Sequence, residues 1–147
     1  MAPINAYFDG ACWPINPGGN LAYGFYFEDQ SGELCYAAGD LYEWADPKQG
    51  SNNVAEYYAA FSLLKTLVEL ELQNEKIIIH GDSKLVTNQL AGNWKIKAGA
   101  YVAVAHKCLS ILTRFSNIAF KWIPREQNAV ADYLSKEPLK KLGYIAK

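Results

Sequence analysis

The first 42 residues hold three strand-like segments joined by short turns, and this feature restricts the fold most strongly. Within residues 4–11, apolar side chains alternate with polar or aromatic ones at the period of a strand. Residues 21–28 and 33–42 also have strand-forming composition, and the sequences NPGG and DQSG separate the three segments. Because loops this short join antiparallel neighbours, the chain should begin with an antiparallel meander.

Helices and strands are expected to alternate in the rest of the chain. A polar cap at Ser51-Asn52-Asn53 precedes apolar residues with helical spacing up to residue 71 or 72. Three isoleucines within residues 76–81 are typical of a strand covered on both faces. The remaining predicted elements are helices over residues 83–91, 100–115 and 128–136, the last ended by Pro138, and a strand over residues 118–123.

This order of elements, β-β-β-α-β-α-α-β-α, predicts the fold class. Crossover connections between parallel strands are right-handed and place their helices over the faces of the sheet. We therefore expect an α/β protein with a five-stranded mixed sheet, in which three antiparallel strands are followed by parallel strands. Helices should cover both faces of that sheet.

The length of 147 residues suits one domain. We expect it to span residues 1–138, followed by a short lysine-bearing tail over residues 139–147. Half of the residues are apolar, as in a globular protein, and no apolar run suits a membrane span or a signal peptide. The three cysteines are widely spaced without a C-x-x-C pair, which argues against zinc and disulfides. A monomeric, cytoplasmic protein with reduced cysteines and no membrane partner is expected.

Charge is distributed unevenly along the chain, although the net charge is only −1. Residues 1–82 contain 3 Lys against 12 Asp or Glu, whereas residues 83–147 contain 11 Lys or Arg against 3 Asp or Glu. No acid occurs between Ser83 and Arg125. This asymmetry indicates either ordinary surface patchiness or a basic face that can meet phosphate groups.

Four carboxylates occupy positions where they could converge. Asp9 ends the first predicted strand and Asp82 ends the fourth. If these strands are parallel neighbours, both side chains emerge at the same carboxyl edge, where open α/β sheets build their sites. Glu56 lies in the first turn of the long helix and leans toward its packed side, and Asp132 lies in the first turn or two of the last helix.

Each of these acids also has a purely structural interpretation. Glu56 follows Asn53 at the spacing of a capping box, and Asp132 near a helix N-terminus is favoured by the helix dipole. Asp82 could cap the helix that follows it. Asp9 could accept hydrogen bonds from the amides of the glycine-containing loop after its strand.

Taken together, the four acids favour a metal site. Carboxylates gathered at one sheet edge repel one another and raise their own pKa values unless cations neutralise them. Oxygen ligands without nearby His or Cys select hard ions, Mg²⁺ first and Mn²⁺ second. Two such ions about 4 Å apart are what metal-dependent phosphodiester hydrolysis requires. Asp9 should therefore face a metal that it shares with Asp82 and Glu56, and a separation of Asp9 from Asp82 beyond about 10 Å would exclude this site.

Four ordered motifs resemble the type 1 ribonuclease H family over nearly the whole chain. They are DGAC…NPGG (residues 9–19), SNNVAEYYA (51–59), HGDSKLVTNQLAGNWKIK (80–97) and WIPREQNAVADYLSK (122–136). The resemblance implies cleavage of the RNA strand of an RNA/DNA hybrid with Mg²⁺ or Mn²⁺. It also implies that the catalytic, metal-binding carboxylates are Asp9, Glu56, Asp82 and Asp132.

The resemblance further implies three groups of substrate contacts. The main chain of Gly10, Ala11 and Cys12 would approach the RNA minor groove, where the 2′-hydroxyls lie. Amides and hydroxyls that contact the nucleic-acid backbones or minor-groove edges would come from Asn16, Ser51, Asn52 and Asn53. The DNA strand would be flanked by Trp94, Lys95 and Lys97. The alternatives are turn and cap chemistry for the polar group and an ordinary core position for the tryptophan.

Two departures from the family pattern stand out. Many members have a histidine in a loop before the last acid, but this chain has PREQNAVAD there. Arg125 or Glu126 could substitute in part, Arg125 by stabilising charge near the scissile phosphate, whereas His80 is better explained as a hydrogen-bonded core imidazole. The second departure is that residues 99–115 have room for one helix only, so the basic protrusion of some bacterial relatives should be missing.

Three functional hypotheses follow. The first is a sequence-nonspecific endoribonuclease that acts on RNA/DNA hybrids by a two-metal-ion mechanism and leaves 5′-phosphate and 3′-hydroxyl ends. The second is a catalytically silent domain of the same fold that only binds nucleic acid or partners. The third keeps the chemistry and adds double-stranded RNA as a substrate, because A-like duplexes share the shape of the minor groove.

Overall fold

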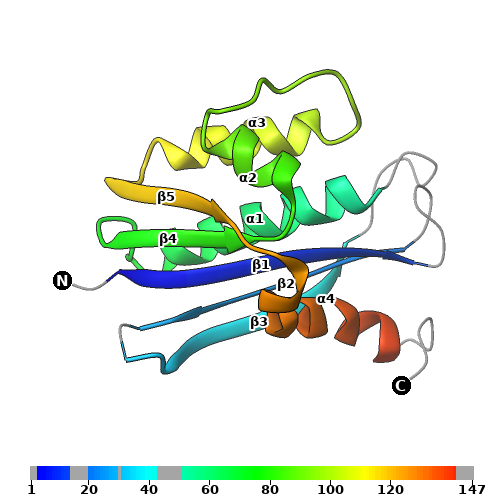
Figure 1. Cartoon of the computed structure of the whole chain (residues 1–147), viewed down its shortest axis with the longest axis horizontal. Helices are drawn as coiled ribbons and strands as arrows, with labels where there is room; N and C mark the ends of the chain where they lie inside the picture. Colours follow the sequence, from blue (N-terminus) through cyan, green and yellow to red (C-terminus); the bar gives the residue numbers. More distant parts are fainter. Residues whose placement is uncertain (1–2, 14–19, 30, 43–50, 142–147) are drawn as a thin grey trace.

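The computed structural model describes residues 3–13, 20–29, 31–42 and 51–141, and within them five strands form one mixed sheet. The spatial order is β3-β2-β1-β4-β5, as Figure 1 shows. The strands are β1 (Ile4–Trp13), β2 (Asn20–Glu28), β3 (Leu34–Tyr42), β4 (Lys76–Gly81) and β5 (Asn117–Trp122). β1, β2 and β3 pair antiparallel, while β4 pairs parallel with both β1 and β5. The predicted fold class and strand arrangement are confirmed.

Helices cover both faces of this sheet, as predicted. They are α1 (Asn52–Glu69), α2 (Lys84–Leu90), α3 (Val102–Leu112) and α4 (Ala129–Lys141), with a short 3-10 turn η1 (Arg125–Gln127) before α4. Figure 1 shows α1, α2 and α3 on one side of the sheet and α4 on the other. A single helix occupies the region between Gly99 and Phe115, so the described chain has no basic protrusion there.

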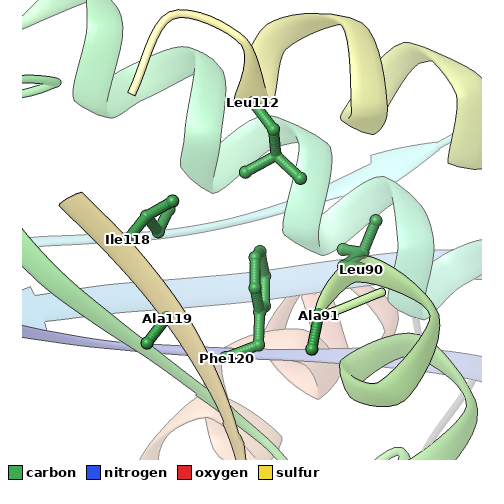
Figure 2. Close-up of a pocket in the computed structure, with 6 residues that line it drawn as sticks. All are labelled: Leu90, Ala91, Leu112, Ile118, Ala119 and Phe120. Carbon is green, nitrogen blue, oxygen red and sulfur yellow. The ribbon is translucent and has the colours of Figure 1, made fainter. Parts of the chain in front are cut away.

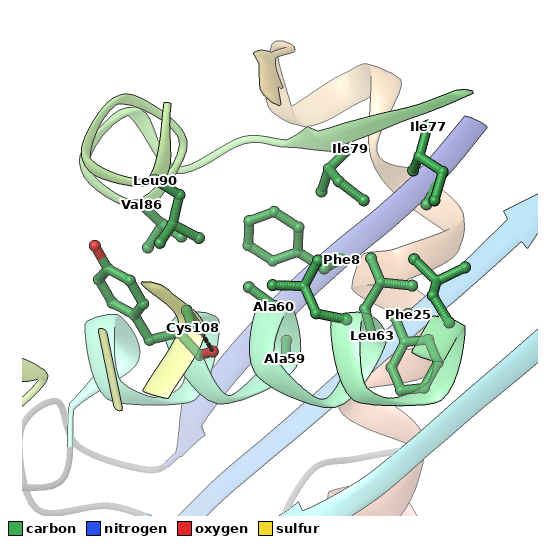
Figure 3. Close-up of a cluster of buried hydrophobic side chains, with 14 of the residues drawn as sticks. Phe8, Phe25, Ala59, Ala60, Leu63, Ile77, Ile79, Val86, Leu90 and Cys108 are labelled. Atoms are coloured by element: carbon green, nitrogen blue, oxygen red, sulfur yellow. Dashed lines mark hydrogen bonds between the residues drawn. The ribbon is translucent and has the colours of Figure 1, made fainter. Parts of the chain in front are cut away.

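The main core lies between the sheet and α1. Alternate residues of neighbouring strands, Phe8 on β1 and Ile77 and Ile79 on β4, point to this side and are buried. Figure 3 shows them meeting the α1 side chains Ala60 and Leu63. Burying a side chain of this size stabilises a fold by roughly 2 kcal/mol, so this cluster fixes α1 against the strands that carry the predicted acids.

The last helix differs from its prediction, because it runs through Pro138 to Lys141 instead of ending there. A proline removes the hydrogen bond to the carbonyl four residues earlier, here Leu134. That carbonyl lies against Gly39 on β3, where a Cβ would come within 2.2 Å of it. The same close packing occurs at Gly24 on β2, where a Cβ would lie 2.5 Å from the Ser135 nitrogen. The helix end predicted at Pro138 therefore falls inside α4.

We predict that Gly24→Ala destabilises the protein by about 2 kcal/mol, because the added methyl group forces α4 away from the sheet. Gly99→Ala is the matched control, since a Cβ there would meet only the movable Tyr101 ring, at 2.9 Å. Urea unfolding should show a clearly lower midpoint for Gly24→Ala than for Gly99→Ala. Equal midpoints would mean that α4 does not depend on this close approach.

Candidate active site

Three of the four predicted acids meet at one edge of the sheet. Asp9 comes from β1, Glu56 from α1 and Asp82 from the residue after β4. The prediction that Asp9 ends its strand was wrong, because β1 continues past it to Trp13. Each offers a carboxylate oxygen, and these oxygens lie within 4.8 Å of one another. Asp9 and Glu56 are only 5% and 6% exposed. The separation of Asp9 from Asp82 is thus far below the roughly 10 Å that would have excluded a shared metal site.

Local packing explains how Glu56 comes close to Asp9 and Asp82. A Cβ on Gly10 would lie 2.3 Å from the Glu56 nitrogen, so the start of α1 rests directly on the β1 backbone. Ser51 caps this helix by accepting a hydrogen bond from the Val54 amide at 3.4 Å. Because α1 begins at Asn52, Glu56 opens its second turn rather than lying in the first.

The structure rules out the helix-capping roles considered for Asp82 and Glu56. α2 is capped by Ser83, whose Oγ accepts from the Val86 amide at 3.2 Å, so Asp82 is not the cap. α1 is capped by Ser51, and Glu56 accepts a hydrogen bond from the Asn52 side chain at 2.7 Å, so the capping box with Asn53 was wrong. Both carboxylates are therefore directed into the cluster.

The environment of the cluster opposes ionisation. Burial raises the pKa of Asp9 to about 9, and the nearby carboxylates push it in the same direction. Burial also raises the pKa of Glu56 to about 7. The pKa of Asp82 is raised as well, again chiefly through burial. Without a counter-charge, the cluster would hold protons at neutral pH.

The described residues supply no cation in direct contact with these three carboxylates. Among the residues that the structure describes, no cation forms an ion pair with Asp9, Glu56 or Asp82. The hydrogen-bond donors are neutral: the Gly10 main chain for Asp9 (3.0 Å), the Asn52 amide (2.7 Å) and the Ser83 side chain for Glu56, and the Asn128 amide for Asp82 (3.3 Å). Converging carboxylate oxygens, held by neutral donors and short of positive charge, fit hard divalent cations.

Asp132 lies beside the cluster rather than within it. It sits in the first turn of α4, as predicted, and pairs with Lys136 at 3.2 Å. Its charge contributes to the raised pKa of both Asp9 and Asp82, so it is close enough to act on them. It also lines a cavity of about 120 Å³ next to the acids, together with Gly10, Ala11, Cys12, Trp13, Asn52, Arg125 and Lys136.

Arg125 approaches the cluster from the 3-10 turn η1 without pairing to it. Its charge lowers the pKa of Glu56 and of Asp82, against the larger effect of burial. It lines the same cavity as the β1 residues 10–13. A cation in this position is available to a negatively charged group that enters the cavity.

The predicted substrate-binding residues are distributed over several places. Gly10, Ala11, Cys12 and Asn52 all line the cavity beside the acids. Ser51 is half-buried and Asn53 is exposed at the start of α1. The prediction for Asn16, and the glycine-containing loop suggested for Asp9, lie outside the described residues.

Trp94, Lys95 and Lys97 form a second surface feature. Trp94 is 47% exposed, so an ordinary core position for this tryptophan is wrong. The three residues line a cavity of about 330 Å³ together with Leu85, Gln89 and Tyr101. An exposed indole that lines a cavity with two lysines remains available for contact with another molecule.

His80 is a core residue, as predicted. Its Nε2 lies 3.1 Å from the Asn5 Oδ1, and its ring stacks on Tyr7 with centroids 4.5 Å apart. Burial, with a smaller effect from Lys121, lowers its pKa to about 4. The imidazole is therefore neutral near pH 7 and tied to the sheet.

Asn128 contacts the site but was predicted only as the approximate start of the last helix. Its side chain is fully buried and donates to the Phe8 carbonyl at 2.9 Å and to Asp82 Oδ2 at 3.3 Å. A polar residue just before a helix has the sequence signal of an N-cap. Nothing in the sequence distinguishes that role from contact with residues 120 and 46 positions away.

A further cavity of about 410 Å³ lies away from these acids, between β5 and the ends of α2 and α3. It is lined by Leu90, Ala91, Leu112, Ile118, Ala119 and Phe120 (Figure 2). None of these side chains can hold a metal or move a proton, so this cavity offers no catalytic chemistry.

Within the described residues, no helix is both long and apolar enough to cross a membrane.

Sequence comparisons connect the chain to a known family. A family model described as reverse transcriptase-like matches residues 23–138. A ribonuclease HI of Halobacterium salinarum is 32% identical over 136 residues, which are 92% of this chain and 64% of that protein. A bifunctional protein of Mycobacterium tuberculosis is 31% identical over 91 residues, 62% of this chain. This chain spans only 24% of the length of that protein.

Solved structures share the fold over almost the whole chain. The ribonuclease H1 of Halobacterium salinarum has a TM-score of 0.82 at 31% identity, covering 95% of this chain and 99% of that one. LC11-RNase H1, solved in complex with an RNA/DNA hybrid, has a TM-score of 0.83 at 30% identity, covering 95% of this chain and 98% of that one. These matches agree with the five-stranded mixed sheet predicted from the sequence.

The raised pKa values predict how the metal-free protein responds to pH. The pKa of Asp9 rises from 3.8 to about 9 on folding, so between these values the folded state keeps a proton that the unfolded state has lost. The free energy of unfolding must therefore fall as pH rises through this window. Asp9→Asn removes this titration, and we expect it to stabilise the metal-free protein at pH 8.5 by at least about 2 kcal/mol.

Urea unfolding in EDTA at pH 6.5 and pH 8.5 checks this prediction. The pKa of His80 is lowered from 6.5 to about 4. Its opposite effect on stability therefore falls mainly below pH 6.5, outside the range compared. Wild type should lose more stability than Asp9→Asn between the two pH values. If the variant is no more stable than wild type at pH 8.5, the burial of Asp9 does not oppose its ionisation.

Proposed function

Because this chain belongs to the reverse transcriptase-like family and shares the fold of type 1 ribonucleases H, we propose that it hydrolyses the RNA strand of RNA/DNA hybrids. It would act as an endonuclease without sequence preference and leave 5′-phosphate and 3′-hydroxyl ends. The observation that carries the proposal is the cluster of Asp9, Glu56 and Asp82, with carboxylate oxygens within 4.8 Å of one another. Four intact acids favour an active enzyme over a silent nucleic-acid-binding domain.

The three clustered carboxylates would hold the divalent ions, Mg²⁺ or, as a substitute, Mn²⁺. Two bound ions supply activation of a water molecule and stabilisation of the leaving oxygen of the phosphodiester. The chain's own part is to keep the ligand oxygens in place by neutral hydrogen bonds. Asp132 completes the acidic set from α4, where its contact with Lys136 restrains it.

Recognition of the hybrid would begin at the cavity beside the acids. The backbone of Gly10, Ala11 and Cys12 lines that cavity, where it can meet the 2′-hydroxyls that distinguish RNA from DNA. Ser51, Asn52 and Asn53, at the start of α1, would contact the nucleic-acid backbones without reading sequence. Asn16 is proposed to do the same.

The DNA strand would lie along Trp94, Lys95 and Lys97. The exposed indole can stack on a sugar or base, and the lysines can pair with phosphates. Neither lysine forms an ion pair in the part of the chain that the structure describes. Their charges therefore remain available to a polyanion.

Arg125 would take over part of the work of the loop histidine that this chain lacks. It faces the cavity shared with Asp132 and already acts electrostatically on Glu56 and Asp82. A guanidinium here can stabilise the charge that develops on the phosphate during cleavage. This role needs no change in protonation, since arginine stays charged.

The proposal predicts cleavage of RNA in RNA/DNA hybrids and no cleavage of DNA/DNA duplexes. Matched labelled duplexes, including RNA/RNA, should be incubated with wild type, Asp9→Asn and Glu69→Gln in Mg²⁺ and in Mn²⁺. Asp9→Asn should lose nearly all activity because a metal ligand is lost, while Glu69→Gln removes an exposed charge at the far end of α1 and should keep it. Cleavage of RNA/RNA would add double-stranded RNA to the substrates.

Two outcomes of this assay would contradict the proposal. If no hybrid is cleaved with either metal, the chain is a silent domain, and binding of the hybrid should then be measured. If Asp9→Asn cleaves as well as wild type, the reaction does not depend on the acidic cluster. End-group analysis of the products tests the expected 5′-phosphate and 3′-hydroxyl.

Arg125→Ala should lower kcat by about 10- to 100-fold, because a charge that stabilises the transition state is removed. Lys65→Ala is the control, since Lys65 is an exposed cation on α1 outside the cavity. Steady-state kinetics on an RNA/DNA hybrid at saturating Mg²⁺ separates kcat from KM. An unchanged kcat in Arg125→Ala would remove Arg125 from the mechanism.

A further inference from the structure

Asn128 lies where three acid-bearing segments of the chain come together. Its side-chain nitrogen donates to the Phe8 carbonyl at 2.9 Å, one residue before Asp9 on β1. The same nitrogen donates to Asp82 Oδ2 at 3.3 Å. Its main-chain carbonyl accepts from the Asp132 amide at 3.0 Å at the start of α4. One residue therefore joins β1, the end of β4 and α4.

Asn128 is itself firmly held. Its main-chain amide donates to the Arg125 carbonyl at 3.0 Å, which closes the turn η1. Its side chain is fully buried, and both side-chain N–H directions are used. Because hydrogen bonds hold both its backbone and its side-chain amide, Asn128 can restrain the Asp82 carboxylate that it contacts. Residues behind a metal ligand orient that ligand in this way.

The hydrogen bonds also fix which way the amide points. Rotating it by 180° would place Oδ1 against the Phe8 carbonyl and the Asp82 carboxylate, both of which are acceptors. In the observed orientation Oδ1 is buried without a protein partner in the described part of the chain. A buried unpaired carbonyl oxygen is unfavourable for the fold. The donor contacts of the nitrogen, rather than the oxygen, therefore account for this orientation.

A neutral donor suits this position better than a charged one. A lysine or arginine against Asp82 would neutralise the carboxylate and compete with divalent ions. The amide of Asn128 instead orients one oxygen of Asp82 and leaves the negative charge of the cluster in place. The geometric effect and the retained charge both favour metal binding.

From these contacts we infer that Asn128 is a positioning residue, which orients Asp82 and ties it to β1 and α4 so that the carboxylates bind divalent ions together. The inference deepens the proposed function and rests on it for the role of the ions in cleavage. It concerns metal affinity first and reaction rate second. It therefore has a test that does not require activity.

The test measures Mn²⁺ binding to the substrate-free protein by isothermal titration calorimetry. Asn128→Leu keeps the size of the side chain and removes the donor, and we expect Mn²⁺ affinity to fall by about 10-fold or more. Leu67→Ala is the matched control, because Leu67 is fully buried near the other end of α1. It should destabilise the fold and leave Mn²⁺ affinity within about twofold of wild type.

A second readout separates positioning from general damage. In hybrid cleavage, Asn128→Leu should raise the Mg²⁺ concentration for half-maximal rate by about 10-fold, with KM for the hybrid little changed at saturating Mg²⁺. Leu67→Ala should show no such shift. Wild-type Mn²⁺ affinity in folded Asn128→Leu would overturn the inference.

Alternative measurements cover a variant that does not fold. Asn128→Ala removes the donor without adding a charge or a bulky group, so it should show the same loss of affinity. If both variants unfold, the side-chain amide signals of Asn128 in the wild-type ¹H–¹⁵N spectrum decide. They should shift on saturation with Mg²⁺, and unshifted signals would contradict a link between Asn128 and the ions.

These outcomes separate the inference from the proposed function. If wild type binds Mn²⁺ through an Asn128-dependent site but cleaves no hybrid, the proposed function fails and the positioning role stands. If wild type cleaves hybrids and Asn128→Leu binds Mn²⁺ like wild type, the positioning role fails and the proposed function stands.

Discussion

Parallel pairing of β1 with β4 is the contact on which the rest of the site depends. The register aligns Ala6 with Ile79 and Tyr7 with His80. Asp9 and Asp82 each lie two residues beyond the last of these pairs, so the parallel register brings both to the same edge of the sheet. α1 can add its glutamate because Gly10 leaves room for the helix backbone. Without this pairing, the carboxylates would be too far apart to share an ion.

The same arrangement sets stability against metal binding. Burial and mutual repulsion raise the carboxylate pKa values, so the ionised cluster destabilises the metal-free fold. Neutral donors hold the oxygens without removing their charge, and this leaves divalent ions as the natural partners. The packing of α1 in the main core and of α4 on β2 and β3 offsets this destabilisation of the fold. Such opposition between stability and function is common at functional sites.

Local patterns in the sequence were sufficient for most of the fold. Strand alternation, short turns and capping residues act over a few positions, so the order of elements and the three converging acids could be predicted. The errors arose where distant packing overrode a local rule. Pro138 does not end α4, and the carbonyl that it frees lies against Gly39 on another strand. For Trp94 the sequence left a core position and a substrate contact open, and the structure shows that this residue is exposed.

The sequence by itself determined the types of the secondary-structure elements, the mixed sheet and the identity of the carboxylates that could bind metal. These features depend on residue chemistry and short-range spacing, which a sequence displays directly. Only the tertiary structure decided that Asp132 lies beside the three clustered acids, that Ser51 and Ser83 cap the helices next to them, and that Asn128 contacts Phe8 and Asp82. Those contacts join residues far apart in the chain, and their geometry exists only once the sheet and its helices have packed together.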